Sequence, residues 1–406
     1  MRARFAVSAL ALGMAAGSTV AQAQIAKVTL YGQLNVDLEF VKGTTCPSAI
    51  AFASTNCPTG SDLSAQTSNP TVTRISSNSS RIGVRGTEYL GRGQVAIFQL
   101  ESHVQADTGN SSSNGLASRE TFVGLQGDWG TVKAGKFLTP YDDIVPIFGN
   151  APTLTTSILS TAALWAQGPL PKSQGGFDAR LGNSIRYETP LLGGFSAELQ
   201  YSTRDSSGNT SGFNGGDNGD HASEVRHANV LSAGAFYSSG PLDIGLAYEY
   251  NHQVRSAEQN DHAFSVAAAY DIGSLVANPG TRVAGIYERL NYGTLAGSLT
   301  RNFWGFSATV PVGGGSFYAF WGRAGNGGGS APDGTGVGMV TRGPDTSCDQ
   351  FEVSYTYALS LRTLLYAGYV RLNNAANAFY TFNINEYAIT TGAKPSGIVF
   401  GMTHFF

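Results

Sequence analysis

The chain has few charged residues and no long apolar run beyond its first two dozen residues. Charged side chains make up 13% of its 406 residues, with 25 basic residues against 28 acidic ones. This balance lacks the basic excess that a nucleic-acid partner requires. A membrane-spanning helix needs roughly 18 or more successive apolar residues, and no segment after residue 23 provides them. The sequence therefore predicts neither a nucleic-acid-binding protein nor a helical membrane protein.

The residues that usually carry chemistry are scattered. The six histidines occur singly, outside any HExxH motif, and no GxSxG motif is present. Residues Gly91 to Ala96 match a dinucleotide-binding pattern, yet they join two alternating segments, whereas that pattern must open a helix. We therefore expect no enzyme, no cofactor and no metal site. The alternative is an outer-membrane phospholipase or protease embedded in a barrel, which would need a nucleophile, a base and an orienting group in one place.

The first residues have the pattern of a secretory signal peptide. Arg2 and Arg4 precede an apolar stretch that runs from Phe5 to Ala16, and small residues follow. We expect cleavage after residue 23, so that residues 1–23 are the signal peptide and residues 24–406 the mature chain.

The chain has only three cysteines, and export places them in an oxidising compartment. Cys46 and Cys57 lie in one polar segment, where a disulfide would close a small loop, but the sequence alone does not fix the pairing. Cys348 would then be unpaired.

Residues Val28 to Phe40 alternate strictly between apolar and polar side chains. A strand with this period has one face toward an apolar medium and one toward water. Strands of soluble sheets usually run about 5–6 residues, whereas a tilted membrane-spanning strand needs about 9–11. The length of this segment therefore favours a β-barrel with lipid outside and water inside.

Reversals marked by glycine and proline divide the rest of the chain into similar segments. Seven of them are short: 90–93, 127–130, 190–194, 239–241, 271–280, 311–315 and 358–362. Eight longer polar connections lie between them: 41–73, 107–116, 137–180, 204–227, 253–261, 291–298, 324–349 and 373–394. Short turns at one end and long loops at the other are typical of outer-membrane barrels. We predict one domain, an all-β, 16-stranded antiparallel transmembrane barrel with short periplasmic turns and long extracellular loops.

Several motifs in this order resemble the trimeric Gram-negative general porins, in particular those of β-proteobacterial type. The motifs are VTLYGQLNVDLEF at 28–40, SRIGVRGTEYLGRG at 80–93, AIFQLES at 96–102, SRETFVGLQGDWGTVKAGK at 118–136, NSIRYETPLLGGFSAELQYS at 183–202 and GMTHFF at 401–406. The resemblance covers the whole mature chain. It implies a water-filled channel in the cell outer membrane through which small hydrophilic solutes and ions diffuse passively. A porin tuned to a particular substrate is the variant of this function that the sequence leaves open.

The same resemblance implies partners. We expect a homotrimer in contact with outer-membrane lipid and lipopolysaccharide. The terminal Phe406 resembles the signal that the barrel-assembly machinery reads, although a final strand that merely closes the barrel would also end here.

The resemblance further implies that the third long loop, 137–180, folds into the lumen and narrows it. This loop has an apolar side that a surface loop does not need, formed by Ile144, Val145, Ile147, Phe148, Leu154, Ile158, Leu159, Leu164 and Trp165. Packing against the inner wall would bury these side chains. An apolar patch for trimer contacts is the alternative.

General porins line the wall opposite this loop with arginines, and the matching positions here are Arg81, Arg119 and Arg180. Alternation places Arg81 and Arg85 on a water-facing side, and Arg180 together with Arg186. Arg119 shares parity with Val123 and Leu125, so its assignment rests on the motif. The expected carboxylates of the constriction are Glu101, Asp142 and Asp143. Such opposed charges would set a transverse field that filters ions, and we expect a mild preference for anions.

Overall fold

The computed structural model describes residues 26–43, 71–109, 116–150, 157–168, 176–203, 228–255, 259–382 and 391–406. The wall strands of the first half are β1 (Lys27–Lys42), β2 (Val72–Ser77), β3 (Arg81–Gly91), β4 (Gln94–His103), β5 (Thr121–Gly127), β6 (Gly130–Leu138), β7 (Arg180–Glu188), β8 (Phe195–Thr203) and β9 (Asn229–Ser239). Those of the second half are β10 (Leu242–His252), β11 (Asn260–Asp271), β12 (Arg282–Thr294), β13 (Gly297–Val312), β14 (Gly315–Ala324), β17 (Cys348–Ala358), β18 (Thr363–Asn374) and β19 (Ser396–Phe405). The predicted signal peptide lies outside the described residues, as do Cys46 and Cys57.

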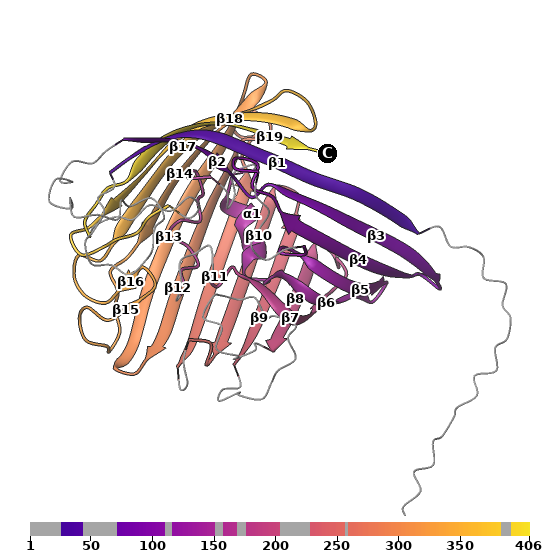
Figure 1. Cartoon of the computed structure of the whole chain (residues 1–406), viewed down its shortest axis with the longest axis horizontal. Coiled ribbons are helices and arrows are strands. Elements are labelled where there is room, and N and C mark those ends of the chain that lie inside the picture. The colour runs from indigo at the N-terminus through magenta and orange to yellow at the C-terminus, as the bar shows by residue number, and fades with distance from the viewer. Residues whose placement is uncertain are drawn as a thin grey trace, which may run out of the picture.

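These strands close into one barrel (Figure 1). The first strand, β1, pairs with the last, β19, from Gln33 opposite Phe405 to Lys42 opposite Ser396. Along its other edge β1 pairs with both β2 and β3. These two are therefore parts of one wall strand that is interrupted at residues 78–80. Counted in this way the wall has sixteen antiparallel strands, which confirms the predicted fold class.

The alternation in the sequence sorts the side chains between the two faces of the wall. On β1 one parity is exposed on the outside of the barrel: Val28, Leu30, Leu34, Leu38 and Phe40. The other parity is polar and buried inside: Gln33, Asn35, Asp37 and Glu39. The strand of 16 residues is longer than a tilted crossing needs. Among the described residues, no helix has the length and apolarity needed to cross a bilayer.

The predicted short turns are confirmed, because each joins two strands that pair as a hairpin. The prediction of a long loop at 291–298 is wrong. Strand β12 continues to Thr294 and β13 begins at Gly297, which leaves a two-residue turn. Tyr292 and Leu299 are opposite each other in this ladder and both are fully buried, so the two strands are held together almost to their ends.

The third long loop begins after Leu138 and ends before Arg180, close to its predicted bounds. It contains a 3-10 turn, η2 (Asp142–Ile144), followed by the short helix α1 (Val145–Phe148). Figure 1 shows α1 within the ring of strands, and α1 contacts β10, β11, β12 and β13. Most of the predicted apolar side is buried there: Ile144, Val145, Phe148, Ile158, Leu159, Leu164 and Trp165. Ile147 is partly buried, and Leu154 lies outside the described residues. The expectation that this loop packs on the inner wall is confirmed.

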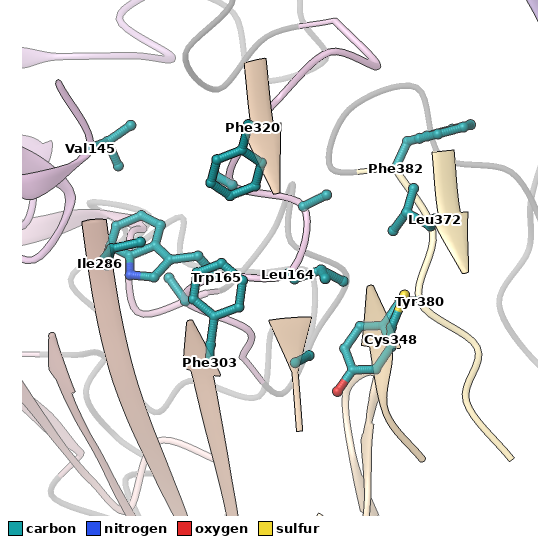
Figure 2. Packing of buried hydrophobic residues seen from close by; sticks show 14 of the residues in the cluster. Val145, Leu164, Trp165, Ile286, Phe303, Phe320, Cys348, Leu372, Tyr380 and Phe382 are labelled. Carbon is teal, nitrogen blue, oxygen red and sulfur yellow. The ribbon is translucent and has the colours of Figure 1, made fainter. Parts of the chain in front are cut away.

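Two further connections cover the third loop at the end of the barrel that carries the long loops. Val337 and Val340, from the small hairpin β15 (Gly336–Val337) and β16 (Val340–Thr341), belong to the same buried cluster. Tyr380 and Phe382 belong to it as well. Figure 2 shows Trp165 next to Ile286 of β12 and Phe303 of β13. Part of the lumen is therefore filled by a dry core.

Cys348, at the start of β17, is buried in this core as a free thiol. In Figure 2 it lies beside Tyr380.

Candidate pore constriction

The two sides of the lumen differ in how far water reaches the charged side chains. Five cations from β3, β6, β7 and the segment before β5 are half-buried or exposed, and we call them the basic wall: Arg81, Arg85, Arg119, Lys136 and Arg180. On the inner faces of β10–β14 and β17–β19 the third loop packs against the strands, and we call this region the packed side. There Glu249, Glu288 and Glu352 are all buried. Among the described residues, the charged side chains on the packed side are therefore the less accessible ones, apart from the pair Arg282–Asp243, whose side chains are about one third exposed.

Glu101 of β4 binds two arginines of the basic wall. Its carboxylate accepts a hydrogen bond of 2.6 Å from Nε of Arg119 and lies 3.5 Å from Nε of Arg81. The hydroxyl of Tyr31 donates a third contact at 3.0 Å. Glu101 thus holds the two guanidinium groups in place.

Arg119 is on the lumen side although its parity predicts the opposite. The reason is that β5 begins only at Thr121, so that the alternation of the strand does not extend back to Arg119. The backbone N–H of Arg119 donates to the carbonyl of Glu101 at 3.0 Å, and its side chain binds the carboxylate of the same residue. Here the motif was a better guide than the period of two.

Arg180 cannot be placed by parity with Arg186, because the ladder between β6 and β7 is irregular. Its register shifts between Gly135 and Phe137, and Asn183 has a positive φ of 51°. Arg180 nevertheless lies within electrostatic reach of Arg119, Glu120 and Asp142. Its buried Nε has no hydrogen-bond partner among the described residues. Asp142 is accordingly the loop carboxylate that faces the basic wall.

Arg186 and Asp143, expected among the free charges of the constriction, bind each other in the structure. Arg186 is only 5% exposed, and its guanidinium binds Asp143 of η2 at 2.5 Å. It also pairs with Glu188 at 2.9 Å and with Glu198 of β8. Arg186 therefore fixes the start of the third loop to the wall. Sequence periodicity gave its correct face but could not show that its charge is compensated.

Arg85 is exposed on the lumen side of β3. Its guanidinium carbon lies 4.9 Å from the centre of the Tyr31 ring, a cation–π contact that leaves the charge available to solutes. Arg85 therefore extends the row of cations from Arg81 toward the short turns.

Three charged or titratable residues of this region were not predicted: Lys136, His103 and Glu120. Lys136 and His103 both interact electrostatically with Arg180. Glu120 accepts a hydrogen bond from Gln99 at 3.3 Å. Lys136 has the parity of the outward Ala134, and only the register shift after Gly135 explains its position. In the sequence, only the position of Lys136 just before the third loop indicated that it could lie at the constriction.

The described residues offer a filter for charge. They contain no group of three or more His, Cys, Asp or Glu side chains that could hold a metal ion. What they bring together is a row of cations beside water, opposite a carboxylate of the inserted loop. Such an arrangement orients dipolar solutes and selects ions by sign.

The comparisons with known proteins agree with this geometry. A family profile described as Gram-negative porin matches residues 6–377. An outer membrane porin protein of Bordetella pertussis is 27% identical over 444 residues, which cover 98% of this chain and 99% of that protein. Outer membrane porin protein 32 of Delftia acidovorans is 25% identical over 422 residues, with 98% and 99% covered. The structure of an anion-selective porin from Comamonas acidovorans aligns with a TM-score of 0.69 at 21% identity, covering 94% of this chain and 100% of that one.

Proposed function

Because this chain belongs to the Gram-negative porin family and forms a channel in the outer membrane, we propose that its conducting path runs between the third loop and the basic wall. Small hydrophilic solutes and ions diffuse through this path down their gradients, and anions are preferred. The comparisons give no support to an enzyme embedded in the barrel.

The observation that carries this proposal is the excess of accessible cations on the basic wall. Five cations stand beside two wall carboxylates, Glu101 and Glu120, and Asp142 is on the loop. An excess of two charges at about 8 Å favours a passing anion by roughly 1 kcal/mol in water, or about fivefold, before screening by salt. The preference is therefore mild. Charges on the distant loops contribute little beyond a screening length of about 8 Å.

Neutralising three of these arginines tests the proposal. The variant Arg81→Gln, Arg119→Gln, Arg180→Gln should move the reversal potential in a salt gradient toward cation preference. The measurement is made on single channels in a planar bilayer, with the unaltered protein beside it. An unchanged reversal potential would contradict the proposed path.

Arg323 provides a matched control. It is a half-exposed arginine of β14 that binds Asp349 at 2.9 Å and has the parity of the outward Phe317. The variant Arg323→Gln removes one arginine charge from the outside of the wall, to be compared with each single arginine variant of the basic wall. Its reversal potential should equal that of the unaltered protein.

We also propose that the barrel assembles as a homotrimer in contact with outer-membrane lipid and lipopolysaccharide, and that Phe406 is read during assembly. Supporting this, the outer face exposes a band of large apolar side chains, among them Leu30, Phe98 and Val123. Phe406 exchanges two backbone hydrogen bonds of 3.1 Å with Gly32 at the end of β19. Light scattering of the protein in detergent should give the mass of three chains, and the mass of one chain would contradict the trimer.

A further inference from the structure

A single buried carboxylate of the wall, Glu288 on β12, binds two separate segments of the third loop. Its Oε1 accepts a hydrogen bond of 2.8 Å from the hydroxyl of Tyr141. The same oxygen accepts one of 2.7 Å from the backbone N–H of Ala166. Tyr141 lies near the start of the loop and Ala166 on its return path. The two segments of the loop are thus joined at one atom.

The side chains around this atom reinforce the connection. Tyr141 stacks on Trp165 with ring centres 5.3 Å apart and planes inclined by 13°. Ser265 of β11 donates to the Tyr141 hydroxyl at 2.6 Å and accepts from the indole N–H of Trp165 at 3.0 Å. Burial and the neighbouring Glu288 raise the pKa of Tyr141 well above its ordinary value. Its hydroxyl therefore remains a proton donor to the carboxylate at any physiological pH.

Glu288 is paired with Arg301 of β13. The two side chains form an ion pair in which both are fully buried. The guanidinium carbon also lies 5.9 and 6.0 Å from the ring centres of Phe303 and Tyr380. A buried pair of this kind is costly to break by removing one partner, because the other charge is then left uncompensated. The residue that binds the two loop segments is therefore itself fixed to the wall by Arg301.

The loop that Glu288 holds covers further carboxylates of the wall. Ser157 of the loop donates to Asp37 of β1 at 2.6 Å. Glu352 of β17 is buried next to Ser354, which accepts a hydrogen bond of 3.0 Å from Asn150 of the loop. Glu249 of β10 is buried and interacts electrostatically with Tyr141. The carboxylates Glu249 and Glu352 of the packed side, together with Asp37 on the neighbouring β1, are thus buried beneath the loop.

We propose that Glu288 is the positioning residue of the constriction: it fixes the third loop over the acidic side of the lumen, so that losing this attachment widens the pore and shifts its preference toward cations. This inference rests on the proposed path between the loop and the basic wall. It adds that the pore width and the ion preference both depend on this attachment.

Two double variants separate the attachment from the buried charge. In Glu288→Leu with Arg301→Leu both charges and the acceptor for Tyr141 and Ala166 disappear, while the net charge of the lumen stays the same. In Glu288→Gln with Arg301→Gln both charges disappear, but an amide oxygen remains to accept from Tyr141 and Ala166. Only the first variant should free the segments around Tyr141 and Ala166 from the wall. Because neither leaves an isolated buried charge, both are expected to fold.

The readouts are single-channel conductance and reversal potential in a salt gradient. For the leucine variant we expect larger conductance states, populated at least about a hundredfold more often than in the unaltered protein, because two hydrogen bonds to a carboxylate are lost. The reversal potential should move toward cations. The glutamine variant should retain the conductance and potential of the unaltered protein. A Glu352→Gln variant controls for loss of a buried wall carboxylate that accepts from Ser354 of its own strand.

Two outcomes for the leucine variant would contradict the role of Glu288. Conductance and potential unchanged in the leucine variant would overturn the proposal, as would equal effects in the leucine and glutamine variants. A wider pore that kept its anion preference would overturn the link between the loop and the acidic wall. If the three-arginine variant still shifts the reversal potential, the proposed path stands whatever the outcome here. Circular dichroism and heat-dependent mobility verify that each variant is a folded barrel.

Discussion

The ion pairs on the two sides of the lumen contain the same kinds of residue but differ in what surrounds them. Glu101 and Arg81 face each other on the basic wall, where the arginine side chain is 28% exposed. Glu288 and Arg301 face each other on the packed side, where both side chains are 0% exposed. Alternation along the strands places all four on the inner face. Whether the third loop packs beside a pair then decides its role: an accessible pair affects the ion preference of the channel, and a buried pair fixes the position of the loop.

The contrast follows from the free-energy cost of burying charge. An exposed pair contributes about 0–1 kcal/mol, because water and salt screen it. A fully buried pair contributes little net stability when intact, yet removing one partner costs about 3–5 kcal/mol. The packed side therefore gains a fixed geometry from its charges, whereas the basic wall keeps charges that solutes can meet.

The largest difference should appear when one acid is removed from each pair. Glu288→Ala leaves Arg301 buried and alone, so we expect a loss of about 3–5 kcal/mol in the free energy of unfolding. Glu101→Ala leaves Arg81 and Arg119, whose side chains are 28% and 13% exposed and can be partly solvated, so we expect a smaller loss of about 1–3 kcal/mol. Unfolding by denaturant in detergent or lipid, followed by tryptophan fluorescence, measures both. Equal losses would remove the distinction between the two sides.

A smaller difference should appear with salt. The basic wall is in contact with water, so its anion preference should fall as the Debye length shrinks from about 10 Å at 0.1 M to about 3 Å at 1 M. The attachment of the third loop is buried, so the pore width should not change with salt concentration. The anion preference is measured by reversal potentials at a fixed salt ratio and rising concentration. The attachment of the loop is followed by the single-channel conductance, corrected for the conductivity of the bulk solution. A preference independent of concentration would place the selective charges away from water.

The features that the sequence predicted are those that depend on residues close together in the chain. The alternation in β1 gave the inside and outside of the wall, since a period of two is local. The apolar residues of the third loop predicted its packing, since large apolar side chains such as Trp165 and Leu164 are unfavourable in a loop surrounded by water. The motif around Arg119 located a residue whose parity was misleading.

The features that the sequence missed depend on distant partners. Arg186 is compensated by Asp143, which is 43 positions away, and Glu288 holds Tyr141 across 147 positions. No local pattern encodes such pairs. The irregular register before Arg180 was equally hidden, because a bulge changes the face of every residue beyond it. Periodicity thus predicted the faces of the wall, but not which of its charges remain free.

The central claim is that one side of the lumen is wet and the other dry, and the accessibility of introduced thiols tests it most directly. Arg85→Cys and Leu164→Cys are made in a chain whose Cys46 and Cys57 are replaced by serine, and each is exposed to a negatively charged, membrane-impermeant thiol reagent while current is recorded. We predict rapid modification and a fall in current for Arg85→Cys, and no modification for Leu164→Cys in the intact barrel. Rapid modification at position 164, or protection at position 85, would contradict it.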